Sequence, residues 1–351
     1  MSDARIPKAL GPDVDSPDVH IPTALVPTAT DPTATGPTPF VPTDIASAPR
    51  PKQLPKIGYF LLAGVTLFWG INWPAMKIGL AEVTVWWFRA MCVWAGAIGL
   101  LTIAKLSGAS LKVPRDEIPW LLLVALFAML GWQVCSAYGV SLMSAGRASI
   151  IAFTMPVWSA LLGAVLLKEP ITANQIAGLG LGVAGLAVLM GDDLLVFGTA
   201  PIGALFMLGA ALSWAIGTVL FKMYKWTTPI SAHVGWQLAA AAIPITLVAL
   251  LIEPLPDLAS LSTKAMLSLV YLIALPMVFC QWAFFKVVSI FPASIASMGT
   301  LAVPVVGVYS SALILGEPVG WRELAALMLI CSALVCVLVL PAWRRRPSPA
   351  R

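Results

Sequence analysis

The chain has 351 residues, of which 59% are hydrophobic and only 11% carry a charge. Soluble domains average about 45–50% apolar and about 25% charged residues, so this composition excludes a soluble globular fold. The formal net charge is +5, but the basic residues lie at the edges of apolar runs rather than in a groove or stripe. This placement favours a lipid bilayer as the partner and argues against nucleic acid.

Residues 1–56 form a region of their own. Proline recurs with a strict five-residue period from Pro7 to Pro42, and threonine follows it at the last five steps. Such a segment cannot build a core, so the sequence predicts a disordered Pro/Thr-rich tail. The chain opens without a basic segment that precedes an apolar stretch and a cleavage site, so we expect no cleaved signal peptide.

Ten apolar runs joined by short connections follow from Ile57 onward. Runs of about 20 residues are long enough to cross a hydrocarbon core of about 30 Å as helices. The sequence therefore predicts an all-α integral membrane protein with ten transmembrane helices. The expected spans are 57–79, 84–105, 118–140, 147–167, 173–190, 201–222, 231–252, 265–286, 294–315 and 321–340.

The second half of the chain repeats the first. A motif of Ala-Ser, Pro-Val and Glu-Pro between Ala148 and Pro170 recurs without a gap 148 residues later, between Ala296 and Pro318. Each repeat carries five helices, an odd number, so the two insert with opposite orientation. Two inverted five-helix repeats around a central cavity are the architecture of a secondary transporter that works by alternating access. The expected domains are the tail 1–56, a first repeat 57–190, a second repeat 201–341 and a basic tail 342–351.

The lysine and arginine residues of the short loops predict the orientation in the membrane. Thirteen of them fall on one side and at most five on the other. Because cytoplasmic loops carry the excess of these residues, we expect both termini, including the proline-rich tail, to be cytoplasmic. The expected location is the inner or plasma membrane, with multiple crossings.

Lys77 and Arg89 lie inside the first two predicted spans and face each other across the short turn between them. Ionisable groups within spans usually line an aqueous path, so this pair could form an electropositive mouth for an anionic group of a substrate. Alternatively, both side chains extend to the membrane surface and anchor helix ends.

The middle of every predicted span lacks Asp and Glu, and His233 is the one titratable candidate for proton coupling. We therefore expect efflux or exchange driven by the substrate gradient. The five cysteines lie inside apolar runs without the short spacing of a metal or redox motif, so the sequence predicts no metal and no cofactor.

Uncharged polar residues in matched positions supply further candidates for the cavity wall. Gln133 and Gln281 are 148 residues apart, and Trp69 pairs with Trp214 at an offset of 145. A buried amide either holds two helices together or contacts the substrate. The remaining candidates of this kind are Asn72, Trp73, Tyr138 and Gln237.

Pro156 and Pro304 lie near the centres of the fourth and ninth spans. A proline inside a helix removes a backbone donor and kinks the chain. The two prolines are either fixed packing kinks or a matched pair of hinges for alternating access. Side chains within two turns of them that could line the cavity are Thr154, Trp158, Thr300 and Tyr309.

These features resemble the EamA-like transporters of the drug/metabolite transporter superfamily over about residues 57–341. The resemblance implies ten helices in two inverted repeats around a central cavity. It also implies export of small metabolites, often amino acids or related compounds. The second copy departs from the pattern, with Ser294-Ile295 where the first has Gly146-Arg147. The residues that carry the resemblance are 68–73 (FWGINW), 88–90 (FRA), 144–148 (SAGRA), the stretch from Pro156 to Glu169-Pro170, and Ala293 to Glu317-Pro318.

Three readings other than a carrier stay open at this point. An integral-membrane enzyme, such as a lipid-linked group transferase, needs a cluster of acid, metal or nucleophile, and only Asp192-Asp193 offers an acidic pair. A channel needs a selectivity filter, which the sequence lacks. A non-transporting sensor would bind the same ligand without moving it. Gly178 and Gly182 predict close helix packing, either within the chain or in a homodimer.

Overall fold

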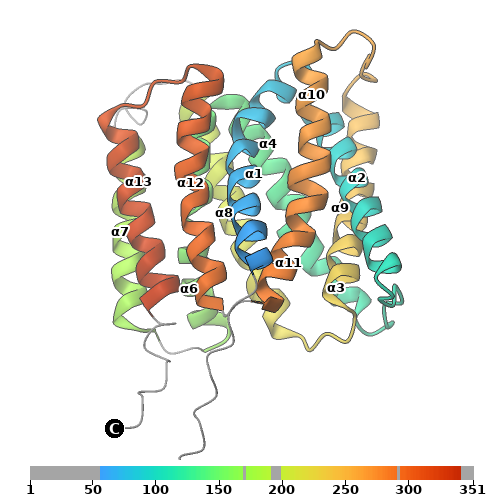
Figure 1. Ribbon diagram of the computed structural model, residues 1–351, viewed down its shortest axis with the longest axis horizontal. Coiled ribbons are helices and arrows are strands. Elements are labelled where there is room, and N and C mark those ends of the chain that lie inside the picture. The colour runs from blue at the N-terminus through green and yellow to red at the C-terminus, as the bar shows by residue number, and fades with distance from the viewer. Residues whose placement is uncertain (1–55, 169–170, 191–198, 291–292, 341–351) are drawn as a thin grey trace, which may run out of the picture. The chain divides into compact units, whose positions relative to one another are not determined.

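The computed structural model describes residues 56–168, 171–190, 199–290 and 293–340 (Figure 1). In these ranges the chain is helical apart from turns and loops, the longest of which are 107–117 and 253–262, and it contains no β-strand. The all-helical prediction is therefore confirmed. The predictions for the tails fall almost wholly on residues 1–55 and 341–351, which lie outside the described residues, so they stay predictions.

The N-terminal half, up to Met190, crosses the bundle several times. Its third passage is one continuous rod in which a π-helical segment separates two α-helices. The elements are α1 (Lys56–Leu80), α2 (Val85–Leu106), α3 (Ile118–Val124), η1 (Ala125–Gly131), α4 (Trp132–Leu142), α5 (Ala145–Ala152), α6 (Met155–Leu166) and α7 (Ala173–Met190).

The C-terminal half has a similar succession of elements, including a second rod interrupted by a π-helical segment. Its elements are α8 (Thr199–Met223), α9 (Ile230–Ile252), α10 (Thr263–Leu272), η2 (Ile273–Cys280), α11 (Gln281–Ile290), α12 (Ala293–Leu315), α13 (Trp321–Leu334) and η3 (Val335–Val339). Successive passages run in opposite directions between the two ends of the bundle, called here the upper and lower ends as they appear in Figure 1.

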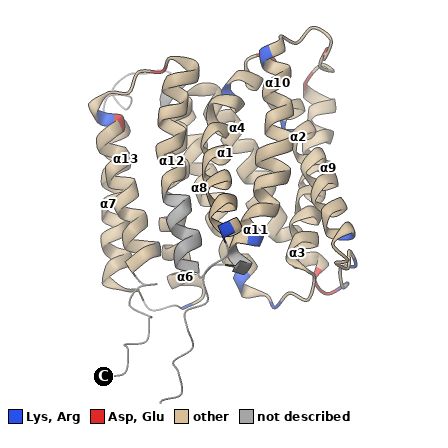
Figure 2. Cartoon of the chain, in the orientation of Figure 1, with Lys and Arg blue, Asp and Glu red and all other residues tan. Residues whose placement is uncertain are grey.

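Seven helical runs in the described residues are long and apolar enough to cross a membrane, and 173–189 and 302–315 are shorter apolar helices. Large apolar side chains face outward from these helices, as Leu313 (86% exposed) and Leu251 (82% exposed) illustrate. An apolar exterior on long helices is what a hydrocarbon solvent requires. The described chain is therefore a multi-pass membrane protein, with most of its charged residues toward the two ends of the bundle (Figure 2).

Helices of the two halves interleave rather than forming separate bundles. The most extensive packing joins α2 to α9, α1 to α12 and α4 to α8, and each pair takes one helix from each half. The helix α7 likewise packs on α13 of the other half: a Cβ on Gly178 would lie 3.1 Å from the backbone oxygen of Ala333. The close neighbour of this glycine is thus within the chain.

Carboxylates at the upper end bind the first N–H groups of helices in the opposite half. Glu82 accepts hydrogen bonds from the N–H and hydroxyl of Ser262, the N-cap of α10. Glu253 accepts from the N–H groups of Trp86 and Trp87 at the start of α2, at 3.3 and 3.1 Å. The first N–H groups of a helix lack partners within it and attract negative charge. These side chains therefore fasten the two halves together.

At the lower end another carboxylate joins the two halves. Glu117, at the start of α3, accepts hydrogen bonds from the N–H and hydroxyl groups of both Thr227 and Thr228, just before α9. Burial of the Glu117 carboxyl would raise its pKa, but these four hydrogen bonds favour the charged form and lower the pKa to about 2. The carboxylate thus stays ionised in all but strongly acidic solution.

Pro156 and Pro304 have different surroundings. The helix α5 ends at Ala152, a turn follows at Phe153–Thr154, and Pro156 lies in the first turn of α6, where its missing N–H is not needed. Pro304 lies inside the uninterrupted helix α12. The fourth predicted span is therefore broken while the ninth is continuous, so the two prolines do not form matched kinks in this structure. A hinge role for either stays a prediction.

We predict that Glu117→Gln lowers the free energy of unfolding by about 1–3 kcal/mol, because hydrogen bonds to a charged group are lost. The free carboxyl titrates at 4.5 and the folded one near 2. Its contribution is therefore complete above pH 4.5 and is lost as the pH falls toward 2. Thermal unfolding of the detergent-solubilised protein between pH 3 and 7 checks this. Asp257→Asn, in an exposed loop, is the control, and an equal effect of the two substitutions would contradict the assignment.

We predict that Gly217→Ala destabilises the bundle by about 1–3 kcal/mol through overpacking. A Cβ at Gly217 of α8 would lie 2.6 Å from the backbone nitrogen of Ala128 in η1, and backbone cannot move aside. Gly180→Ala is the matched control, because nothing lies within 4 Å of its Cβ, and it should raise stability by about 0.5–1 kcal/mol. Thermal unfolding of both variants measures the contrast, and similar unfolding temperatures would refute it.

Candidate functional site

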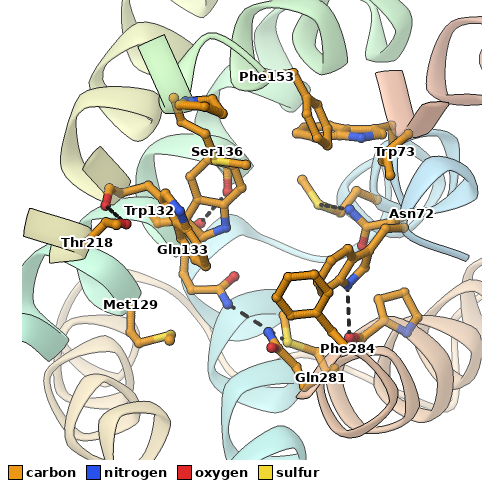
Figure 3. A pocket seen from close by; sticks show the side chains of 18 of the residues that line it. Asn72, Trp73, Met129, Trp132, Gln133, Ser136, Phe153, Thr218, Gln281 and Phe284 are labelled. Atoms are coloured by element: carbon orange, nitrogen blue, oxygen red, sulfur yellow. Dashed lines mark hydrogen bonds between the residues drawn. The ribbon is translucent and has the colours of Figure 1, made fainter. Parts of the chain in front are cut away.

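A cavity of about 370 Å³ lies among the middle stretches of helices from both halves. Its wall is mostly aromatic and apolar, with a few polar groups (Figure 3). This size and character are typical of sites for small organic ligands. The lining residues are Trp69, Asn72, Trp73, Met76, Arg89, Met129, Trp132, Gln133, Ser136, Phe153, Met155, Pro156, Trp214, Thr218, Pro276, Met277, Gln281, Phe284, Val303 and Leu334.

Several residues singled out from the sequence meet around this cavity. They come from α1, α2, α4, α6 and α11, which are far apart in the chain. Their roles there stay predictions. The residues concerned are Asn72, Trp73, Arg89, Gln133, Pro156 and Gln281.

Other predicted site residues lie elsewhere. Tyr138 accepts a hydrogen bond from Trp86 Nε1 at 2.9 Å, and Trp158 donates to the hydroxyl of Thr154 at 3.0 Å. Tyr309 faces the exterior and is 50% exposed. None of these four predicted residues lines the cavity. The side chain of Thr300 lies outside what the structure describes.

Gln237 belongs to a second buried cluster. Its Nε2 lies 2.6 Å from Nδ1 of His233, whose ring packs against Phe221 and Trp226. Neither Gln237 nor His233 lines the cavity. The residues described around the cavity include no Asp, Glu or His, so a titratable group for proton coupling is missing from this wall.

Lys77 and Arg89 do not form one electropositive mouth. Lys77 Nζ donates to the carbonyl oxygens of Val140, Ser141 and Met143 at 2.8, 3.0 and 2.8 Å. These carbonyls belong to the end of α4 or lie just after it, where they lack helical partners and favour a cation. With its donors used this way, the ammonium group holds α1 against α4.

Arg89 lies in the cavity wall and is only 2% exposed. Its Nη2 donates to Ser136 Oγ at 2.7 Å and to Met76 Sδ at 3.4 Å. Its Nε has no hydrogen-bond partner, and no carboxylate in the described ranges forms an ion pair with it. A buried cation without a counter-ion is unfavourable, so this arrangement needs an explanation beyond packing.

Gln133 and Gln281, the pair 148 residues apart, extend toward each other from α4 and α11 (Figure 3). Gln133 Nε2 makes only a weak contact with Met277 Sδ at 3.9 Å, and its Oε1 has no partner. The matched spacing in the sequence thus corresponds to side chains at one site. Their amides leave an acceptor free in an otherwise apolar wall.

Some lining residues were not singled out from the sequence as site residues. The sequence marks Trp69 and Trp214 as partners in the duplication, and that pairing is the signal that points to them. Ser136 and Thr218 carried no such signal, because single hydroxyl residues are common in apolar helices. Ser136 becomes visible only through its hydrogen bond to Arg89, 47 residues away in sequence.

Comparison with known proteins identifies the family. The model of the EamA-like transporter family matches residues 56–191 and 201–339. The chain belongs to the EamA-like transporter family. This family is part of the drug/metabolite transporter superfamily, so the chain is a membrane transporter and not an enzyme.

Individual relatives of this EamA-like protein agree. It is 28% identical over 276 residues to an uncharacterized transporter, YoaV, of Bacillus subtilis, covering 78% of this chain and 94% of that one. It is 27% identical over 288 residues to a probable amino-acid metabolite efflux pump of Salmonella typhimurium, covering 78% and 92%. A solved crystal structure matches with a TM-score of 0.60 at 20% identity, covering 82% of this chain and 98% of that chain, which shows a shared fold.

We predict that Lys77→Met lowers the free energy of unfolding by about 1–3 kcal/mol, because the carbonyls at the end of α4 lose a charged donor. Lys222 follows Lys77 by 145 residues, the offset that also relates Trp214 to Trp69, and it is exposed at the end of α8. Lys222→Met should therefore change stability by less than about 0.5 kcal/mol. Thermal unfolding in detergent compares the two. Equal stability of the two variants would show that Lys77 does not hold α1 to α4.

Proposed function

We propose that this protein exports small metabolites, amino acids or related compounds, across the inner or plasma membrane by alternating access. The observation that carries the proposal is the cavity of about 370 Å³ between the two halves, which has the size for such a ligand. The relative from Salmonella typhimurium named a probable amino-acid metabolite efflux pump supports the substrate class. Membership of the EamA-like family supports transport rather than chemistry.

We further propose ten crossings in two inverted five-helix repeats. The family model matches the chain twice, once in each half. Corresponding contacts at opposite ends of the bundle support the inversion. Glu82 binds Ser262 at the upper end, and Thr227 binds Glu117 at the lower end. Positions 82 and 227, and positions 117 and 262, are both 145 residues apart, the offset of the repeat. An inverted repeat places equivalent contacts on opposite faces of the membrane, and it offers two related shapes that open to either side.

In this proposal the lower end faces the cytoplasm. The first described helix, α1, begins there, and the last helical passage, α13 with η3, ends there (Figure 1). The loop 107–117 at the same end carries Lys112 and Arg115, in agreement with the excess of basic residues expected of cytoplasmic loops. Both termini are then cytoplasmic.

The same cavity would serve a sensor that binds ligand without moving it. Counterflow in proteoliposomes separates the two functions, because only a carrier exchanges labelled for unlabelled substrate. The wall described here lacks Asp, Glu and His, which favours efflux or exchange driven by the substrate gradient over proton coupling.

We predict that purified protein in proteoliposomes supports saturable counterflow of at least one amino acid, and that a protonophore leaves it unchanged when the substrate gradient is fixed. Thr218→Phe, which adds bulk to the cavity wall, should reduce counterflow by about tenfold or more. Leu313→Phe, on the outward face, is the matched control and should be neutral.

Three results would each contradict a separate part of this proposal. Ligand binding without counterflow would identify a sensor. Loss of counterflow on addition of the protonophore would identify proton coupling. Full activity of a stably folded Thr218→Phe would remove the cavity from the transport path.

A further inference from the structure

We propose that Arg89, with Ser136 and Gln133, forms a binding subsite for a carboxylate that has an N–H donor beside it. The inference rests on the proposed transport function and names the part of the substrate that the cavity recognises. It assigns to Arg89 a ligand-binding role and to Lys77 a structural one.

The guanidinium charge of Arg89 has no counter-ion within the described residues. Arginine stays protonated in proteins, yet Arg89 is 98% buried and has only a hydroxyl and a thioether as acceptors. Its Nε–H has no acceptor, and the indole N–H of Trp73, in the same wall, has none either. Two unpaired donors, one of them cationic, call for an anionic acceptor from outside the protein.

The number of cationic side chains in the cavity wall indicates the charge of the ligand. Arg89 is the one cationic side chain among the described residues that line the cavity, and the donors of Lys77 are committed to three backbone carbonyls. A single guanidinium matches the charge of a carboxylate and can bind it with two parallel hydrogen bonds. A phosphate dianion would leave charge uncompensated in an apolar site.

A hydrogen-bond acceptor, Gln133 Oε1, lies on the same helix as the Ser136 hydroxyl that binds Arg89. Gln133 and Ser136 are three residues apart on α4, so they share a face of the helix. Gln133 Oε1 is buried without a donor. An N–H group next to the ligand carboxylate would satisfy it, as the α-amino group of an amino acid does.

The rest of the cavity wall is largely aromatic. Indole and phenyl rings from Trp69, Trp132, Trp214 and Phe284 surround the remaining space. Aromatic faces accommodate an apolar body and attract an ammonium group. The chemical class is therefore a small monocarboxylate with an adjacent N–H donor and an uncharged side chain.

The test compares acids with their amides. The probes are L-phenylalanine, L-leucine and 3-phenylpropionate and the three corresponding carboxamides, with binding to detergent-solubilised protein measured by calorimetry and ligand-induced thermal shift. We expect the wild type to prefer acids over amides. Arg89→Gln should reduce affinity for the acids by about 10- to 100-fold and leave the amides unchanged, since charge-assisted hydrogen bonds are lost. Arg89→Lys should retain part of the preference.

Stability without ligand separates binding from a structural role. Removing an uncompensated buried cation should leave the unfolding temperature of Arg89→Gln equal to or above that of the wild type, because binding residues often reduce stability. Lys222→Gln is the matched control for charge and should change neither stability nor acid preference.

Absence of an acid preference across the wild-type panel would overturn the inference, as would an unchanged preference in Arg89→Gln. A preference retained by an Arg89→Gln protein of lowered stability would reassign Arg89 to structure. Failure of the inference is distinguishable from failure of the proposed function. Equal counterflow of acids and amides would support transport and contradict the carboxylate subsite. Acid-selective binding without counterflow would support the subsite and contradict transport.

Discussion

The fold depends on the need to satisfy the first N–H groups of helices at the ends of an apolar bundle. These groups lack partners within their own helix. At the upper end carboxylates from distant loops supply partners, Glu82 to the N-cap of α10 and Glu253 to the start of α2. At the lower end Glu117 binds the N–H groups just before α9. Glu317 does the same for Ala145 and Gly146 at the start of α5, at 2.7 and 2.9 Å. Each contact crosses between the halves, so closing the helix ends also assembles the bundle.

In the cavity, unlike at the helix ends, several polar groups have no hydrogen-bond partner. Its polar groups are few and incompletely paired, although unpaired polar groups in an apolar wall are unfavourable. Arg89 and Gln133 both retain a buried atom without a partner. Lys77, by contrast, is fully engaged by backbone carbonyls. The difference divides two basic residues of similar appearance in the sequence into one that stabilises the bundle and one that is left available to a ligand.

The sequence predicted the helices well, because long apolar runs admit few alternatives in a membrane. The duplication also marked Gln133 and Gln281, which reach the same cavity. It did not reveal the partners of Lys77 or Arg89, because these depend on the relative rotation and depth of α1, α2 and α4, which a one-dimensional pattern does not encode. Tyr309 and Gln237 were misleading for the same reason: their depth suited a cavity, but one faces outward and the other binds His233. Pro156 was placed correctly along the chain, yet whether a proline bends a helix or opens a new one depends on the turn before it.

The contact between α2 and α9 has a mechanical consequence. At the upper end Glu253, the C-cap of α9, accepts hydrogen bonds from the N–H groups at the beginning of α2. Toward the lower end Trp236 of α9 donates to the backbone oxygen of Leu111, in the loop that follows α2. Two helices joined near both ends can tilt together, but they cannot separate while both hydrogen-bonded contacts are intact. In the proposed alternating access, a passage to one face would then widen on the opposite flank, where α1, α5 and α12 pack together, and α2 with α9 would be the stationary pair.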